Sequence, residues 1–202
     1  LSGWAGASPL VGRAPDTKTL QREYDPVIAP TGLLAGMPDR ETARYRLYAA
    51  RRGRLEPIPF QFDARGADDE LVLSADGAEA DFAFDDNAEL VFMAKDSGDR
   101  AATDMLPATG DAALEIQIVD RARTATAWAY LVHFATSPPP RSPVRYAAFD
   151  PDRQEARALS YQVSYSHNRS NFLRGIRILP EAGGSGANLV DRLTMRIMPT
   201  FS

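Results

Sequence analysis

The sequence contains no cysteine in its 202 residues. This absence excludes disulfide bonds, thiolate metal sites, cysteine nucleophiles and covalently attached c-type haem. No stretch approaches the roughly 18 consecutive apolar residues of a membrane-spanning helix, so we expect the chain not to span a membrane with one. Lysine is also scarce, because two lysines accompany 21 arginines. A GC-rich bacterial genome accounts for that ratio, and so does a surface built for bidentate pairing of arginine with carboxylates.

Negative charge is concentrated in one part of the chain. Residues 61–120 carry sixteen Asp and Glu against three basic residues, a net charge of −13, whereas the remaining residues sum to +9. The overall balance of −4 argues against a nucleic-acid-binding surface. Clustered carboxylates repel one another, so they are solvated, paired with arginine or bound to a cation.

Short segments rich in β-branched and aromatic residues recur from Thr42 onward, separated by proline and glycine turns. The clearest are 113–119 and 124–134, which alternate between apolar and polar or small residues and predict a hairpin. About ten such segments predict an all-β fold, an antiparallel β-sandwich or a flattened barrel.

The distribution of prolines predicts the domain organisation. Residues 1–40 are interrupted by five prolines, so we expect an extended Pro/Gly-rich N-terminal arm there, with room for one short strand around 27–34. Residues 41–202 are then a single sandwich domain. A proline-rich connector at 138–143 marks an alternative boundary inside it.

The acidic segment also holds a candidate metal site. Carboxylates and an amide crowd before an apolar strand at 89–94, and calcium takes six to eight hard oxygen ligands. The spacing does not match an EF-hand loop, so the site would be built from loops at the rim of the sandwich. The candidate calcium ligands are Asp81, Asp85, Asp86, Asn87 and Glu89. A solvated loop whose Asp and Asn residues form turns is the alternative, as is ion pairing with the arginine-rich flanks.

A second candidate site combines aromatic rings with polar side chains in and after the alternating segment 158–165. Such combinations are typical of sugar- and peptide-binding surfaces. The candidate ligand-binding residues are Tyr161, Tyr165, His167, Asn168, Arg169 and Asn171. Core tyrosines whose hydroxyls reach solvent are the alternative.

The two histidines, His133 and His167, offer a third site. A catalytic zinc usually needs three protein ligands, so an acid such as Asp150 would have to join them. The alternative is a strand-end His133 satisfied by hydrogen bonds and a loop His167 in water. Met93 and Lys95 could ligate haem in a β-sandwich, which leaves an electron-transfer function open.

One pattern resembles a known class of proteins. Ile58-Pro-Phe-Gln-Phe-Asp63 followed by Asp86-Asn-Ala-Glu-Leu-Val-Phe-Met-Ala-Lys-Asp96 resembles a pattern in exported bacterial β-rich proteins, over residues 40–100. The resemblance implies export and β structure, and it carries no activity or catalytic residues. Ala5-Gly6-Ala7, which has the small residues of a signal-peptide cleavage site, also favours a periplasmic, outer-surface or extracellular location.

No Gly-x-Ser-x-Gly elbow, Ser-x-x-Lys pair or phosphate-binding glycine loop is present, so an enzyme is not favoured. We therefore expect a non-enzymatic, exported binding or accessory module of a cell-envelope or extracellular protein assembly, with a protein partner. One alternative is a carbohydrate-binding or carbohydrate-active sandwich with a calcium-supported acidic loop. The second alternative is the haem-binding electron-transfer sandwich.

Overall fold

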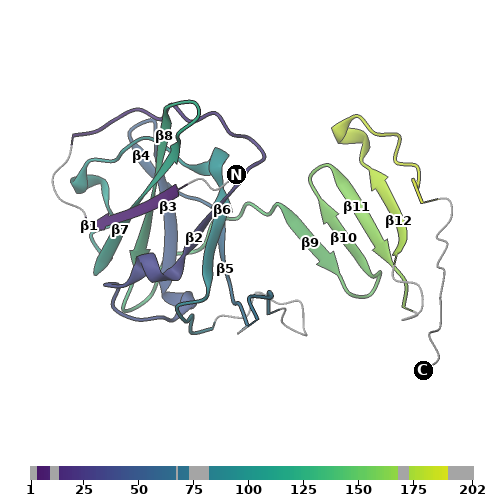
Figure 1. The fold of residues 1–202 in the computed structure, drawn as a ribbon, viewed down its shortest axis with the longest axis horizontal. Helices are drawn as coiled ribbons and strands as arrows, with labels where there is room; N and C mark the ends of the chain where they lie inside the picture. Colours follow the sequence, from purple (N-terminus) through teal and green to yellow (C-terminus); the bar gives the residue numbers. More distant parts are fainter. Residues whose placement is uncertain (1–3, 10–13, 67, 73–81, 168–172, 191–202) are drawn as a thin grey trace, which may run out of the picture. The chain divides into compact units, whose positions relative to one another are not determined.

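The computed structural model describes residues 4–9, 14–66, 68–72, 82–167 and 173–190. The chain forms two compact units, Leu1–Val144 and Arg145–Ser202, and each is described by itself (Figure 1). We expected one domain over 41–202 with an alternative boundary near 138–143, and the division falls directly after that proline-rich connector. Prolines fix the backbone dihedral φ and lack an N–H donor, so the run at 138–143 does not join the sheets of the units before and after it.

The fold is all-β, as the sequence predicts, with every sheet antiparallel. Among the described residues, the helical segments are single 3₁₀ turns: η1 (Thr31–Leu34), η2 (Thr42–Arg44), η3 (Ala94–Asp96), η4 (Thr103–Met105) and η5 (Pro180–Ala182). The first unit contains β1 (Trp4–Pro9), β2 (Pro26–Pro30), β3 (Tyr45–Arg51), β4 (Arg54–Pro57), β5 (Phe60–Asp63), β6 (Glu89–Met93), β7 (Ala112–Asp120) and β8 (Ala125–His133). The second unit contains β9 (Ala147–Asp150), β10 (Glu155–Ala158), β11 (Tyr161–Tyr165) and β12 (Leu173–Ile178).

The first unit is sandwich-like, because two sheets share one apolar core. A five-stranded sheet has the order β1-β7-β8-β3-β4, and a three-stranded sheet has the order β2-β6-β5. The core joins side chains of both sheets, among them Leu47, Ile116 and Leu131 from the larger and Leu90 and Phe92 from the smaller. Alternation along each strand sends every second residue into this core.

The opposite face of the five-stranded sheet is also covered. Trp128, Tyr130 and Val132 of β8 lie in a second buried cluster, beneath the segment that follows β6. This segment inserts Gly98 between β3 and β8 and hydrogen-bonds its N–H and C=O to Trp128. A methyl group on Gly98 would lie 2.1 Å from the carbonyl oxygen of Ala50, so only glycine fits there. The long strand β8 is therefore buried on both faces.

The N-terminal segment contributes two strands. β1 pairs with β7 at the edge of the larger sheet, and β2 pairs with β6 at the edge of the smaller one (Figure 1). Most side chains of residues 14–25 are exposed, as expected for an arm, but Leu20 is buried in the core. Pro9, Pro26 and Pro30 stand at strand ends on edge strands, where a missing N–H is tolerated. Prolines in the sequence therefore do not exclude strands here.

A four-residue hairpin loop of the same design occurs in both units. The aspartate that ends the first strand, Asp120 or Asp150, accepts hydrogen bonds from the second and third N–H groups that follow it. The last loop residue, Thr124 or Gln154, has a positive φ of 51° or 54°. An L-amino acid is strained in that conformation, so the aspartate cap helps to hold each loop.

Candidate functional site

The described residues of the predicted calcium site lie at the rim of the smaller sheet, in a turn at 85–88 and at the start of β6. Asp85 Oδ1 accepts hydrogen bonds from the backbone N–H groups of Asn87 (3.0 Å) and Ala88 (3.1 Å). The hydroxyl of Thr31 donates to the carbonyl oxygen of Asp85. Asp81 lies outside the described residues. This geometry matches the turn-forming role of Asp and Asn.

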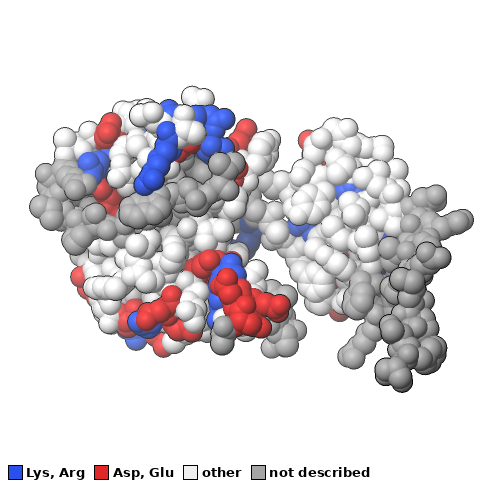
Figure 2. Space-filling model, in the orientation of Figure 1, with Lys and Arg blue, Asp and Glu red and all other residues white. Residues whose placement is uncertain are grey.

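The other acids of this region pair with arginine. Asp86 lies 2.7 Å from Arg40, and Glu89 lies 2.8 Å from Arg65. Figure 2 shows acidic and basic side chains next to one another on the first unit. Among the described residues, the acids of the segment 61–120 that have arginine partners include those of the pairs Arg22–Asp120, Arg40–Asp86, Arg51–Asp96, Arg65–Glu89 and Arg100–Glu115. Three of these arginines precede the acidic segment in the chain, so part of the uneven charge distribution is balanced inside the first unit.

No cluster of three or more His, Asp or Glu side chains arranged to hold a metal ion occurs in the part of the chain that the structure describes. A calcium ion at Asp85, Asp86 and Glu89 would have to compete with the arginines and the turn hydrogen bonds. The calcium site therefore stays a prediction.

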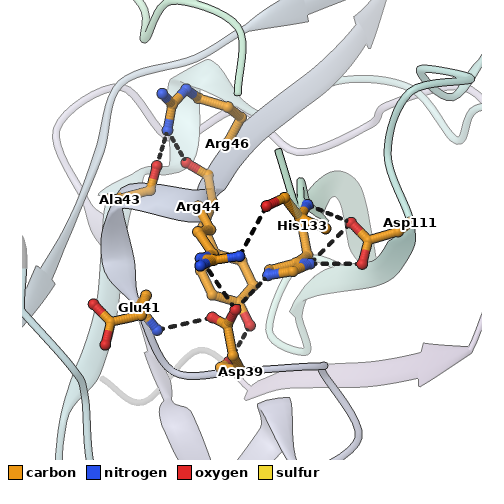
Figure 3. Close-up of polar contacts among 9 residues, drawn as sticks. Asp39, Glu41, Ala43, Arg44, Arg46, Asp111 and His133 are labelled. Carbon is orange, nitrogen blue, oxygen red and sulfur yellow. Dashed lines mark hydrogen bonds and ion pairs between the residues drawn. The ribbon is translucent and has the colours of Figure 1, made fainter. Parts of the chain in front are cut away.

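Buried His133 is the centre of a polar cluster that the sequence did not reveal (Figure 3). It ends β8, and its side chain is 2% exposed. Its Nδ1 lies 2.9 Å from the carboxylate of Asp111, and its Nε2 lies 2.9 Å from Oδ2 of Asp39. Carboxylate oxygens only accept, so both contacts are hydrogen bonds when both ring nitrogens carry hydrogen, as in the imidazolium form. The cluster ties β8 to the chain before β3 and to the start of β7.

Both aspartates of this cluster are held in the charged form. Burial alone would raise the pKa of Asp39, but hydrogen bonds from the N–H of Glu41 and from His133, with the charge of Arg44, outweigh it and lower that pKa. The pKa of Asp111 is also lowered, because hydrogen bonds from His133 and from the N–H of Ala135 outweigh the effect of burial. His133 is thus a buried strand-end residue whose two ring nitrogens each face a partly exposed carboxylate.

The two histidines belong to different units of the chain, His133 to the first and His167 to the second. Both nitrogens of His133 face aspartates of the first unit, so neither is available as a metal ligand in this arrangement. His167 is exposed in the second unit, in the loop after β11. For the haem alternative, Met93 ends β6 and Lys95 lies in η3 directly after it. The zinc and haem sites stay predictions.

The predicted ligand-binding residues belong to the second unit. Tyr161 and Tyr165 are the first and last residues of β11, so they point to the same side of the sheet. Asn168, Arg169 and Asn171 lie outside the described residues. The aromatic part of the predicted site is therefore placed by the structure, and most of its polar part is not.

The second unit is a four-stranded meander with one apolar and one polar face. The strand order is β12-β11-β10-β9, and directly opposed residues of antiparallel strands share a face. The register, which shifts at a β-bulge beside Tyr165, thus defines an apolar sheet face: Ala147, Phe149, Ala156, Ala158, Tyr161, Val163, Tyr165, Leu173, Ile176 and Ile178. The other face carries Ala148, Asp150, Glu155, Arg157, Gln162, Ser164, Gly175 and Arg177.

Among the described residues of the second unit, the apolar sheet face is exposed or half-buried. Phe149 is 48% exposed, Tyr161 46% and Ile178 39%, and no residue of this face is buried. Among the described residues of the second unit, Leu179 is the one buried large hydrophobic side chain. An antiparallel sheet of this kind normally packs one face against a core, so an uncovered apolar face marks a surface built to be covered.

Sequence reasoning identified only part of this surface. The strict alternation of 158–165 pointed to Tyr161 and Tyr165, but Phe149 and Ile178 lie in short segments with few alternating positions. Their cross-strand register could not be read from the chain, because β9 and β12 are the outer strands of the meander.

The chain was compared with family models, curated proteins and solved structures. No family model, no curated protein and no solved structure matches it. Within the described residues, no helix has the length and apolar character needed to cross a membrane.

Proposed function

We propose that this chain is a non-enzymatic, exported binding module of a protein assembly, and that the apolar sheet face of β9–β12 is its docking surface. The observation that supports the proposal is the exposure of Phe149, Tyr161 and Ile178 on one uncharged face. Exposed contiguous apolar surface of this kind is typical of protein interaction sites, where aromatic residues are enriched. Export rests on the resemblance and on the small-residue motif near the N-terminus.

The composition of the face favours a protein over a glycan. Sugar-binding surfaces combine aromatic rings with hydrogen-bonding side chains that fix the hydroxyl groups of the ligand. On the apolar sheet face, the neighbours of Tyr161 and Tyr165 are instead apolar: Tyr165 lies edge-on to Phe149, and the rest are alanine, valine, leucine and isoleucine. Contact with an apolar protein surface removes such side chains from water, so the carbohydrate alternative has less support.

The buried polar groups of the first unit favour a structural role over catalysis. His133 has an aspartate at each nitrogen, and buried Glu115 accepts hydrogen bonds from Arg100 and Tyr130. A general base or nucleophile needs a side chain that can reach a substrate. In both clusters the candidate groups are engaged by neighbouring side chains, which supports the non-enzymatic assignment.

The proposal is tested by affinity capture with the full-length chain in an extract of its source. Val163→Asp places a charge in the middle of the apolar sheet face, whereas the neighbouring Gln162→Glu places one on the opposite face. We expect the chain and the Q162E variant to retain the same protein, identified by mass spectrometry, and the V163D variant to lose it. Equal capture by all three chains would refute the docking surface.

A further inference from the structure

The two halves of the apolar sheet face differ in side-chain size. One cross-strand row runs Phe149, Ala156, Val163, Ile176, and the next runs Ala147, Ala158, Tyr161, Ile178. The half formed by β9 and β10 is therefore alanine-rich with one phenylalanine, and the half formed by β11 and β12 carries valine, tyrosine and isoleucine. Side chains therefore project less from the β9–β10 half of the face than from the β11–β12 half.

We propose that the occupant of this face is a second copy of the chain, related by a twofold axis parallel to the strands; the inference rests on the proposed function and names its partner. Such an axis places β9 over β12 and β10 over β11 of the second copy. Three of the four opposed pairs then join a small residue to a larger one, Ala156 to Val163, Ala158 to Tyr161 and Ala147 to Ile178, while in the fourth Phe149 lies opposite Ile176. Sheets that pack face to face interdigitate in this way.

The charge of the face suits self-association. In a twofold contact the same face of both copies meets, so a face with charges of one sign would repel the face of the second copy. The apolar sheet face carries no Asp, Glu, Lys or Arg, while the opposite face carries acids and arginines such as Glu155 and Arg177. Pairing of two copies therefore buries no charge.

The size of the face predicts a weak, reversible dimer. Four strands about 4.8 Å apart and about five residues long at about 3.4 Å per residue cover roughly 20 by 17 Å. The accessible surface of the side chains is larger than this flat outline, so two copies together bury on the order of 1,000 Å². This is the lower limit for a specific interface. We expect dissociation in the micromolar range.

Sedimentation velocity of the full-length chain over about 1–200 µM tests this inference. We expect a concentration-dependent dimer that V163D weakens at least about tenfold, since burying an unpaired charge costs more than about 1.4 kcal/mol. The Q162E control should dimerise like the unmodified chain. Val163 faces solvent in part, so the variant should fold; Tyr161→Asp, at a more exposed position of the same face, is the second variant.

A mixing experiment tests the twofold arrangement itself. Ala156→Lys and Val163→Asp should each be monomeric alone, but a mixture should form a heterodimer, because the new lysine lies opposite the new aspartate of the other copy. A dimer that V163D and the Tyr161 variant leave intact, or a mixture that stays monomeric, would overturn the inference.

The experiments distinguish failure of the second copy as partner from failure of the docking surface itself. If the chain stays monomeric to about 200 µM while capture of a different protein depends on Val163, the second copy is refuted and the docking surface stands. If the chain is monomeric and captures nothing, both are refuted.

Discussion

Replacing Arg100 by methionine should destabilise the first unit by about 3–5 kcal/mol, because it leaves the buried carboxylate of Glu115 without its counter-ion. Arg100 donates to both oxygens of Glu115, at 3.2 Å from Nε and 2.7 Å from Nη2. The two side chains are 14% and 8% exposed. The Tyr130 hydroxyl, which accepts the N–H of Ala101, adds one hydrogen bond to Glu115 at 3.3 Å. One weak donor does not compensate a buried charge.

The surface pair of Arg40 and Asp86 is the matched control. Its N–O distance is also 2.7 Å, but the side chains are 52% and 78% exposed. Solvent screens such a pair, so Arg40→Met should cost at most about 1 kcal/mol. The double variant R100M/E115Q removes the stranded charge and keeps an acceptor for Tyr130, so it should be more stable than R100M alone.

Urea denaturation followed by tryptophan fluorescence measures these changes. Both tryptophans, Trp4 and Trp128, belong to the first unit, so the signal reports that unit and not the second. A loss of about 3–5 kcal/mol is a large share of the 5–15 kcal/mol typical of a domain. If R100M loses less than about 1 kcal/mol, or if the double variant is as unstable as R100M, the charge of Glu115 is solvated and the reasoning is refuted.

Three further predictions concern backbone strain and pH. Gly98→Ala should destabilise the first unit by at least about 1–3 kcal/mol, because the new methyl group would lie 2.1 Å from the Ala50 carbonyl oxygen; an unchanged urea midpoint would contradict it. Thr124→Gly should stabilise by about 0.5–1 kcal/mol, because it relieves a positive φ of 51°, and the melting temperature should rise. The pKa of Asp39 is lowered, so its contribution to stability is complete above its ordinary value of 3.8 and is lost as the pH falls through the lowered value. His133→Gln should therefore reduce the loss of unfolding free energy as the pH falls through the acidic range. An unchanged slope of unfolding free energy against pH would refute the role of His133 in lowering the pKa of Asp39.

The parts of the fold that were predictable are those encoded by local alternation. β7 and β8 each carry nine residues whose alternate positions differ in character, so both the hairpin and the two faces of β8 follow from the sequence. β1 was not predicted, because the prolines within and beside it indicate interruption, whereas β2 overlaps the short strand expected around 27–34. Only the edge position of both strands, a property of the sheets, makes those prolines acceptable.

The polar clusters could not be predicted, because their members are distant in the chain. Asp39 and Asp111 meet at His133 only when the chain before β3 and the start of β7 come together at one end of the larger sheet. Likewise the acidic segment suggested metal ligands, whereas the structure places Arg40 and Arg65 beside its carboxylates. Charge counts along a sequence show that partners are needed and do not show which partner is nearest.

The scarcity of buried apolar side chains in the second unit has a thermodynamic consequence. A four-stranded sheet with Leu179 as the one large hydrophobic residue buried in its described part gains little from folding alone. Its stability should therefore follow mass action, with the folded fraction rising as the concentration of the covering partner rises. In dilute solution the amide protons of β9–β12 should exchange faster than those of β7 and β8, and the difference should shrink as the protein is concentrated.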